Sequence, residues 1–228
     1  MKILVACEES QRVCISFREK GHEAYSCDIL DCSGGHPEWH IKADVLPLLN
    51  GNTTFLTADG QEHSIDGKWD MILAFPPCTH LAVSGASSFA KKREDGRQRE
   101  GIEFFCQFLT VDCDKVVIEN PVNVISGDYC VKWFPDIAKE YGLPHKPTQY
   151  IQPYEHGEPT RKKTGLWIKG LPKLKPTDVV EPELVTYVNK NGEIRTDTKW
   201  HQATGKGDGK ERSKTYWGIA KAMADQWG

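Results

Sequence analysis

Three short, uninterrupted apolar runs constrain the fold more than any other feature of this chain: KILVAC at 2–7, MILAF at 71–75 and KVVIE at 115–119. Strands that are hydrophobic on both faces are typical of a parallel sheet covered by helices on both sides. Between them, VCISFREKG at 13–21 and REGIEFFCQFL at 99–109 have apolar residues at helical spacing. This alternation predicts an α/β fold with a mostly parallel, doubly wound sheet.

The pattern changes after residue 148. The segment 147–170 predicts two strands around a polar turn, and therefore an antiparallel hairpin at the edge of the sheet. Residues 171–212 are rich in Pro and Gly, so we expect a short loop-rich insertion there. In the closing stretch, Ile219, Met223 and Trp227 are four apart and predict a final helix. A length of 228 residues favours a single domain over residues 1–228.

The sequence also indicates the cellular compartment in which the protein is expected. No run approaches the roughly 18–20 apolar residues of a membrane span, and MKILVACEES lacks the layout of a signal peptide. The eight cysteines are scattered without a CxxC pair, which favours reduced thiols. We therefore expect a cytoplasmic protein that does not bind a membrane. Its oligomeric state is not predictable from these patterns.

Positive charge is concentrated locally. The net charge of −3 gives no overall attraction to nucleic acid, but basic clusters occupy 91–99, 160–176 and 195–214. We expect these clusters to hold a nucleic-acid backbone, with the basic run at 161–163 as the best substrate contacts. GKGDGK at 205–210 lacks the spacing and setting of a phosphate-binding loop.

Polar or reactive residues follow several predicted strands, where ligands bind in open α/β sheets. They are Glu8 and Glu9, Asp28, Cys78, and the Glu119–Asn120 pair. Two prolines precede Cys78 and fix the backbone, so its thiol should be displayed rather than packed. A buried carboxyl at Glu119 needs a partner or a raised pKa, which suits an acid that donates a proton.

A zinc site is a competing interpretation of one cluster. Cys27, Cys32, His36 and His40 have spacings that permit metal ligation. Cys27, however, immediately precedes Asp28 on a predicted strand, so its side chain should point toward the core. We therefore expect no metal ion at these residues.

FPPC at 75–78 and IENP at 118–121, roughly forty residues apart, resemble the Pro-Cys and Glu-Asn motifs of DNA cytosine-5 methyltransferases. The strings FPPCTHLAVSG, GLWIKGLP and GIAKAMADQWG resemble small phage and bacterial proteins that are usually identified as cytosine methyltransferases. The resemblance implies a single Rossmann-like (class I) methyltransferase domain and S-adenosylmethionine as cofactor. It also implies DNA, duplex or single-stranded, as substrate, and a bacterial cell or phage-infected bacterium as the setting.

The resemblance also implies roles for individual residues, with Asp28 at the cofactor ribose and Asp44 near its adenine. The expected catalytic residues are Cys78, Glu119 and Asn120. The expected cofactor contacts are Ala6, Cys7, Glu8, Glu9, Asp28, Ile29, Asp44, Val45, Phe75, Pro76, Tyr216 and Gly218. The expected substrate contacts are Pro77, Thr79, His80, Ser84, Arg161, Lys162 and Lys163.

The chemistry of cytosine explains the two central residue types independently. C5 is too weak a nucleophile to accept a methyl group unaided, but a thiolate that adds to C6 makes C5 enamine-like. An acid at N3 then takes up the electrons pushed into the ring. Cys78 and Glu119 supply these roles, and a base within a duplex would first be flipped out.

Three features depart from the family's pattern. ACEESQR at 6–12 has no glycine where the family has Phe-x-Gly-x-Gly, and TRKKT at 160–164 replaces Gln-x-Arg-x-Arg. Only about forty residues separate the hairpin from the final segment, in place of a full target-recognition domain. Two alternatives therefore stay open: a methyltransferase-like protein that only binds nucleic acid or nucleotide, and an enzyme that modifies free cytosine nucleotides.

Overall fold

A seven-stranded sheet organises the computed structural model, which describes residues 1–189, 191–198 and 209–228. Its order is β3-β2-β1-β6-β7-β9-β8, and the first five strands are parallel. Strand β9 is antiparallel to both of its neighbours, which confirms the predicted antiparallel edge. The strands are β1 (Lys2–Ala6), β2 (Glu23–Asp28), β3 (His40–Lys42), β6 (Met71–Ala74), β7 (Val116–Pro121), β8 (Gln149–Ile151) and β9 (Thr164–Lys169).

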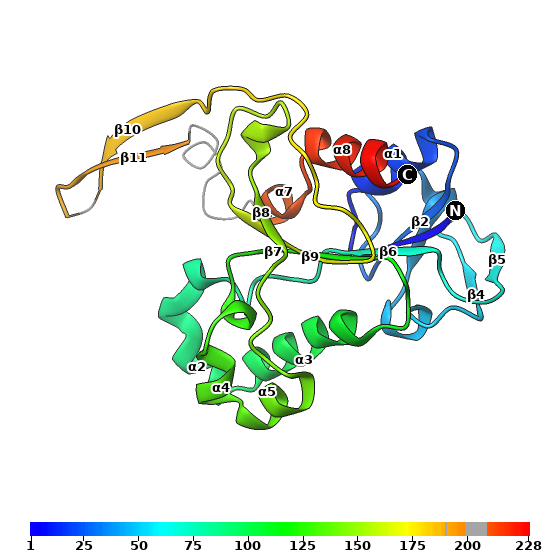
Figure 1. Ribbon diagram of the computed structural model, residues 1–228, viewed down its shortest axis with the longest axis horizontal. Coiled ribbons are helices and arrows are strands. Elements are labelled where there is room, and N and C mark those ends of the chain that lie inside the picture. The colour runs from blue at the N-terminus through cyan, green and yellow to red at the C-terminus, as the bar shows by residue number, and fades with distance from the viewer. Residues whose placement is uncertain (190, 199–208) are drawn as a thin grey trace.

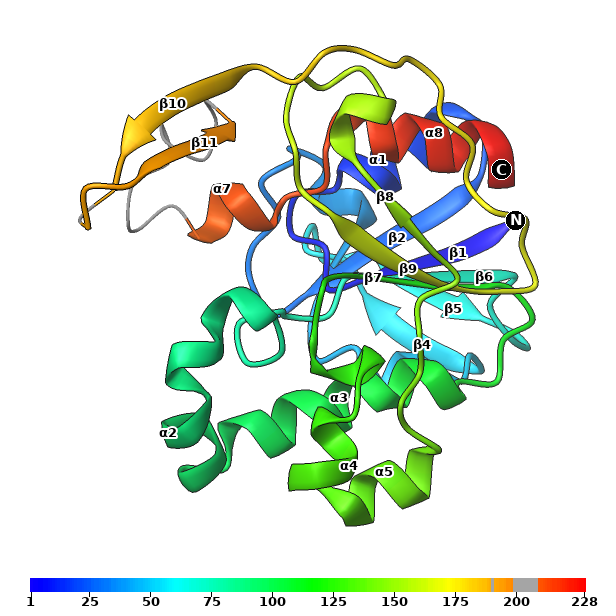
Figure 2. The same ribbon diagram turned by 60° about the vertical axis from the view of Figure 1, so that its left-hand side comes forward.

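Helices cover both faces of this sheet (Figures 1 and 2). One face carries α1 (Arg12–Glu19) and α8 (Trp217–Trp227), which pack against each other. The other carries α3 (Arg97–Thr110), with α2 (Phe89–Glu94), α4 (Tyr129–Trp133) and α5 (Pro135–Tyr141) beyond it. The short helix α7 (Gly209–Ser213) precedes α8. Short 3₁₀ helices are η1 (Pro37–Trp39), η2 (Leu46–Leu48), η3 (Val83–Ser88), η4 (Val124–Ser126) and η5 (Pro153–Glu155).

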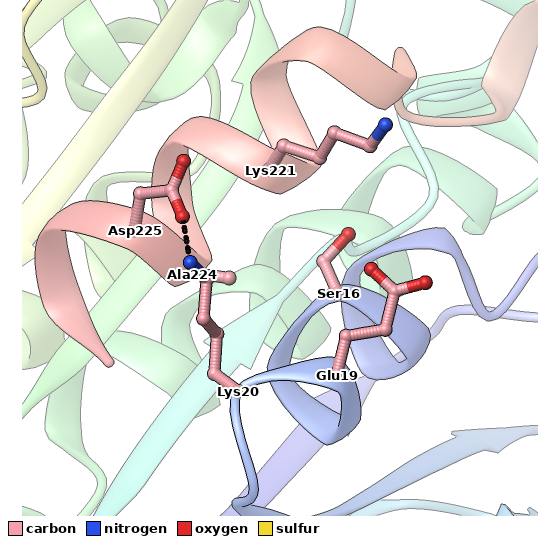
Figure 3. A pocket seen from close by; sticks show the side chains of 6 residues that line it. All are labelled: Ser16, Glu19, Lys20, Lys221, Ala224 and Asp225. Carbon is pink, nitrogen blue, oxygen red and sulfur yellow. Dashed lines mark ion pairs between the residues drawn. The ribbon is translucent and has the colours of Figure 1, made fainter.

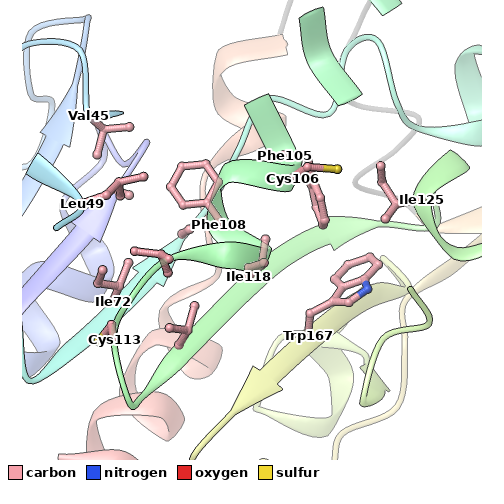
Figure 4. Close-up of a cluster of buried hydrophobic side chains, with 14 of the residues drawn as sticks. Val45, Leu49, Ile72, Phe105, Cys106, Phe108, Cys113, Ile118, Ile125 and Trp167 are labelled. Atoms are coloured by element: carbon pink, nitrogen blue, oxygen red, sulfur yellow. The ribbon is translucent and has the colours of Figure 1, made fainter. Parts of the chain in front are cut away.

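The continuous apolar strands bury side chains on both faces, as their patterns predict. Leu4 and Ile72 face the cluster formed with α3 and α5, part of which Figure 4 shows. Their neighbours Ile3 and Leu73 face the second cluster, formed with α1 and α8. Residues alternate between the faces of a strand, so the central strands need apolar residues at every position.

Two hairpins were not expected from the sequence. One joins β4 (Thr53–Leu56) to β5 (Glu62–Ile65), and the other joins β10 (Leu184–Val188) to β11 (Ile194–Thr198). The second lies within the segment expected to be loop-rich and projects from the body of the molecule (Figure 2). The first four residues of GKGDGK, 205–208, and much of the third basic cluster fall outside the described residues, and the last two residues begin α7. Within the part of the chain that is described, no helix is long and apolar enough to cross a membrane.

Candidate active site

A cavity of about 760 Å³ lies at the carboxyl ends of β1, β2, β6 and β7. The strand order reverses between β1 and β6, and ligands of open α/β sheets bind in the crevice at such a reversal. The cavity is lined by Cys7, Glu8, Glu9, Ser10, Asp28, Ile29, Leu30, Phe75, Pro76, Pro77, Cys78, Thr79, Ala82, Ser84, Glu119, Asn120, Pro121, Lys162, Lys163, Arg212, Ser213, Lys214 and Thr215.

The loop that carries Cys78 is tied to the neighbouring strand β7. The buried amide of Asn120 donates to the Pro76 carbonyl at 2.8 Å and accepts from Asn123 Nδ2 at 3.0 Å. The Cys78 carbonyl itself accepts backbone N–H groups from Leu81 and Ala82. Asn120 therefore holds the Cys78 loop against β7, and it also lines the cavity. Its expected catalytic role stays a prediction.

Helices α2 and α3 hold the far side of the same loop. Lys92 is only 8% exposed, and its Nζ donates to the Thr79 carbonyl at 2.6 Å. Gln98 is fully buried, and its Nε2 donates to the His80 carbonyl at 3.2 Å. Both side chains come from the basic cluster at 91–99, so part of that cluster supports the loop from within the protein.

Cys78 and Glu119 both line the cavity, and the charge of Glu119 affects the Cys78 thiol. Burial raises the pKa of the Cys78 thiol, and the nearby Glu119 raises it further. Burial likewise raises the pKa of Glu119, which favours the protonated acid. Lys162 lowers the pKa of both groups through its positive charge. The arrangement brings together a thiol, a carboxyl group and a cation at one rim of the sheet.

Two hydrogen bonds hold Lys162 in place. Its backbone N–H donates to Gln152 Oε1 at 3.0 Å, and its Nζ donates to the Arg212 carbonyl at 3.0 Å. The first bond fixes the turn before β9, and the second connects this turn to the end of α7. The next residue, Lys163, has its Nζ 4.3 Å from the centre of the Tyr150 ring.

The opposite end of the cavity is built from the turn after β1. Glu8 accepts the backbone N–H groups of Val13 at 2.6 Å and Cys14 at 3.1 Å, so its buried carboxyl caps helix α1. Burial raises the pKa of Glu8 to about 8, and the two N–H donors oppose this shift. Cys7 and Gln11 both have a φ of 59°, so the turn uses the left-handed backbone region without a glycine.

Asp28 ends β2 beside this turn. Its Oδ1 accepts the Leu30 N–H at 2.9 Å, and burial raises its pKa. The exposed side chains of Ile29 and Leu30 form an apolar border next to it. A half-buried carboxylate beside an apolar surface is able to bind hydroxyl groups and a flat ring together.

The structure places several expected site residues outside the cavity. Ala6 and Val45 are buried in the core, because the strand and turn that contain them point these side chains inward. Asp44 is exposed, and its Oδ1 accepts the Leu46 N–H at 3.1 Å in the turn that leads into η2. Arg161 is exposed and does not line the cavity. His80 does not line it either, and its backbone carbonyl accepts a hydrogen bond from Gln98.

Two residues of the closing segment also lie outside the cavity. Burial raises the pKa of Tyr216 to about 12, and its ring packs against the cluster below α1 and α8. A Cβ added at Gly218 would lie 1.7 Å from the His156 carbonyl oxygen. Gly218 therefore permits close packing of α8 on the turn that contains His156, and it makes no contribution to the cavity lining.

The cavity includes residues that were not proposed individually. Arg212 and Lys214 lie in the third basic cluster, so their charge was the available signal. Thr215 is held at the rim because its carbonyl accepts Arg12 Nη1 at 2.9 Å. Nothing local in the sequence indicates this contact, which joins residues distant along the chain. The other additions are Ser10, Leu30, Ala82, Pro121 and Ser213.

Comparison with known proteins adds no relative. No family model matches the chain, and a search of curated proteins gives no match.

The proposed zinc ligands are engaged elsewhere. His40 Nδ1 is 2.9 Å from Ser26 Oγ, and its Nε2 is 2.9 Å from the Leu30 carbonyl oxygen. Cys27 is buried with its thiol toward the Ala43 carbonyl, as its place on β2 predicts. Among the residues that the structure describes, no three His, Cys, Asp or Glu side chains form a group suited to a metal ion.

A second, shallow hollow lies between α1 and α8 (Figure 3). It measures about 140 Å³ and is bordered by the ion pair of Lys20 and Asp225. Its lining is polar and largely exposed, and it contains none of the residues proposed from the sequence.

Proposed function

We propose that this chain is an S-adenosylmethionine-dependent enzyme with a Rossmann-like (class I) methyltransferase fold, which methylates C5 of cytosine in DNA. The observation that carries the proposal is that Cys78 and Glu119 line one cavity and are electrostatically coupled. A protein that only binds nucleic acid needs neither a displayed thiol nor a strand-end acid beside it.

The cavity also suits the proposed cofactor. Asp28 would accept the ribose hydroxyls, Ile29 and Leu30 would contact the adenine, and Glu9 would lie near the cationic amino group. When bound, S-adenosylmethionine supplies an electrophilic methyl group. A volume of about 760 Å³ lies within the usual range for ligand sites.

The mechanism follows from the thiol and the acid. Cys78 Sγ adds to C6 as the thiolate, and Glu119 donates its proton to N3, so C5 gains the electron density needed to take a methyl group. Once C5 carries the methyl group, a water molecule takes the C5 proton, the Cys78 thiolate leaves C6, and the N3 proton returns to Glu119, which restores both side chains. Lys162 assists by stabilising the thiolate, since its charge lowers the pKa of Cys78.

A methyl-transfer assay tests this proposal. The protein is mixed with radiolabelled S-adenosylmethionine and, separately, a single-stranded oligodeoxynucleotide, its duplex, or deoxycytidine monophosphate. We expect label in 5-methylcytosine of the polymer, and loss of transfer in Cys78→Ser. Cys32→Ser is the matched control, because Cys32 is half-buried outside the cavity.

Each alternative predicts a different result in the same assay. Label only in the mononucleotide would indicate an enzyme of free nucleotides. Oligonucleotide binding with no transfer in the unmodified protein would indicate a binding protein. Transfer that persists in Cys78→Ser would exclude the covalent mechanism.

A further inference from the structure

An exposed aromatic ring covered by cations lies on the helices next to the site. Trp133, the last residue of α4, is 45% exposed. The guanidinium carbon of Arg93 lies 3.9 Å from the centre of its ring, and Lys132 Nζ lies 5.1 Å from it. We call Arg93, Lys132 and Trp133 the α2–α4 platform.

Hydrogen bonds connect this platform to the loop of Cys78. Arg93 Nη1 donates to the Tyr129 hydroxyl, which donates to Gln98 Oε1 at 2.9 Å. Gln98 in turn donates to the His80 carbonyl, two residues after Cys78. The platform is therefore part of the same network that holds the nucleophile.

The platform is also continuous with the cavity along the chain. Ser84 lines the cavity and belongs to η3, which leads directly into α2. With a rise of about 2.0 Å per 3₁₀ residue and 1.5 Å per α residue, Ser84 and Arg93 are separated by at most about 16 Å along these helices. A stacked strand rises about 3.4 Å per nucleotide, so about five nucleotides cover this distance.

We propose that the α2–α4 platform binds a nucleotide that flanks the target cytosine in a polynucleotide strand. Trp133 would stack on the base, and Arg93 and Lys132 would contact the phosphates, which is the combination that binds single strands without sequence preference. The inference rests on the proposed function and deepens it, because such a contact selects a polymer over a free nucleotide.

Binding measurements without a methyl donor test the inference. The probes are a fluorescein-labelled single-stranded 12-mer with one central cytosine, its duplex, and deoxycytidine monophosphate as competitor. Trp133→Ala should weaken binding of the single-stranded 12-mer by about 5- to 150-fold, since stacking contributes about 1–3 kcal/mol per base. Competition by the mononucleotide should be unchanged, and Trp133→Phe should retain most of the affinity.

The matched control is Val131→Ala, which removes another exposed apolar side chain, 46% exposed, from the same helix α4. Equal 12-mer affinity in Trp133→Ala and the unmodified protein would overturn the inference, as would an equal loss of mononucleotide binding. A stronger effect on the duplex than on the single strand would reject stacking on an unpaired base. If Trp133→Ala methylated the 12-mer as fast as the unmodified protein does, the proposed function would stand without the platform. If the unmodified protein methylated none of the substrates, the proposed function itself would be rejected.

Discussion

At the residue scale, the charge of Lys162 acts on both groups that the proposed chemistry needs in opposite protonation states, and Arg212 acts on Cys78 as well. Cys78 must lose its proton, whereas Glu119 must keep one until N3 accepts it. Burial raises the pKa of both groups, which helps the acid and hinders the thiolate. Lys162 lowers the pKa of both groups, so it favours the Cys78 thiolate but disfavours the protonated form of Glu119.

The first prediction concerns the pH at which Cys78 reacts. Lys162→Gln removes the charge that lowers the pKa of Cys78, so that pKa rises and less thiolate exists at a given pH. Alkylation by iodoacetamide at pH 8 should slow by about 3- to 10-fold, and the rate profile should move to higher pH. Mass spectrometry of the Cys78 peptide from pH 7 to 10 measures this.

Lys163→Gln is the control for that experiment, because Lys163 lines the cavity but is not among the largest influences on the pKa of Cys78. It should leave the profile in place. Equal slowing in the two variants would show that general loss of positive charge, rather than the position of Lys162, controls the thiol.

The second prediction concerns Gly218. In Gly218→Ala the new Cβ meets the His156 carbonyl, and α8 must shift away from the turn beneath it. We expect a loss of about 3 kcal/mol in the free energy of unfolding, measured by denaturant titration. Gly127→Ala is the control, since a Cβ there meets nothing within 4 Å. Similar stabilities for the two variants would contradict the packing role of Gly218.

The sequence located residues at strand ends better than residues that contact one another across the chain. Cys78, Glu119 and Asp28 line the cavity, because an apolar run followed by a polar residue marks the end of a buried strand. Asp44 and Gly218 lie outside it, since their positions relied on motif order alone. An aspartate in a backbone turn and a glycine at a close helix contact are also residue types that ligand sites use. Only three-dimensional packing distinguishes these structural roles from ligand contacts.

At the scale of elements, the sheet was predictable because its strands are apolar on both faces. The antiparallel edge formed by β8 and β9 also agrees with the change in pattern after residue 148. The hairpin β4–β5 was not predicted, because only Phe55 and Ile65 of its strands are buried and its remaining residues are mixed. A domain of methyltransferase type over residues 1–228 stays a prediction.

The third prediction concerns the support that α2 gives to the Cys78 loop. Lys92→Met keeps a side chain of similar length but leaves the Thr79 carbonyl without its Nζ donor. The loop should loosen, and methyl transfer should slow on the order of 10-fold through kcat rather than KM, because the nucleophile is less well placed. Amide hydrogen exchange at Leu81 and Ala82, whose N–H groups bond to the Cys78 carbonyl, should accelerate.

The neighbouring exposed residue provides the control for this variant. Lys91→Met removes the same charge from the surface of α2, so it should change neither kcat nor the exchange of the loop. If Lys92→Met altered only the global stability, with kcat and local exchange unchanged, the positioning role would be rejected.

At the scale of the whole molecule, two hairpins of similar size are held in very different ways. In β4–β5, Phe55 packs against Tyr25 and Trp69, with ring centres 5.0 and 6.2 Å apart. In β10–β11, the cross-strand partners Val188 and Ile194 are 66% and 75% exposed. Thr198 at the end of β11 is buried, but most other described side chains of the two strands are exposed. An isolated two-stranded hairpin is marginally stable in water, so we expect β10–β11 to open more readily than β4–β5.

The fourth prediction follows from this contrast. Amides of β10–β11 should exchange with solvent deuterium within seconds to minutes, those of β4–β5 more slowly, and those of β1, β6 and β7 most slowly, because exchange follows the burial that each element would lose on opening.

The β10–β11 hairpin projects on the side of the sheet that carries the strand carboxyl ends and α7 (Figure 2), so a bound polynucleotide has room to reach it. Addition of the single-stranded 12-mer should slow exchange in β10–β11 and leave β4–β5 unchanged, which makes the packed hairpin an internal control. Protection of both hairpins would indicate general stabilisation of the fold, and protection of neither would show that the polymer is held by the cavity and the α2–α4 platform without the projecting strands.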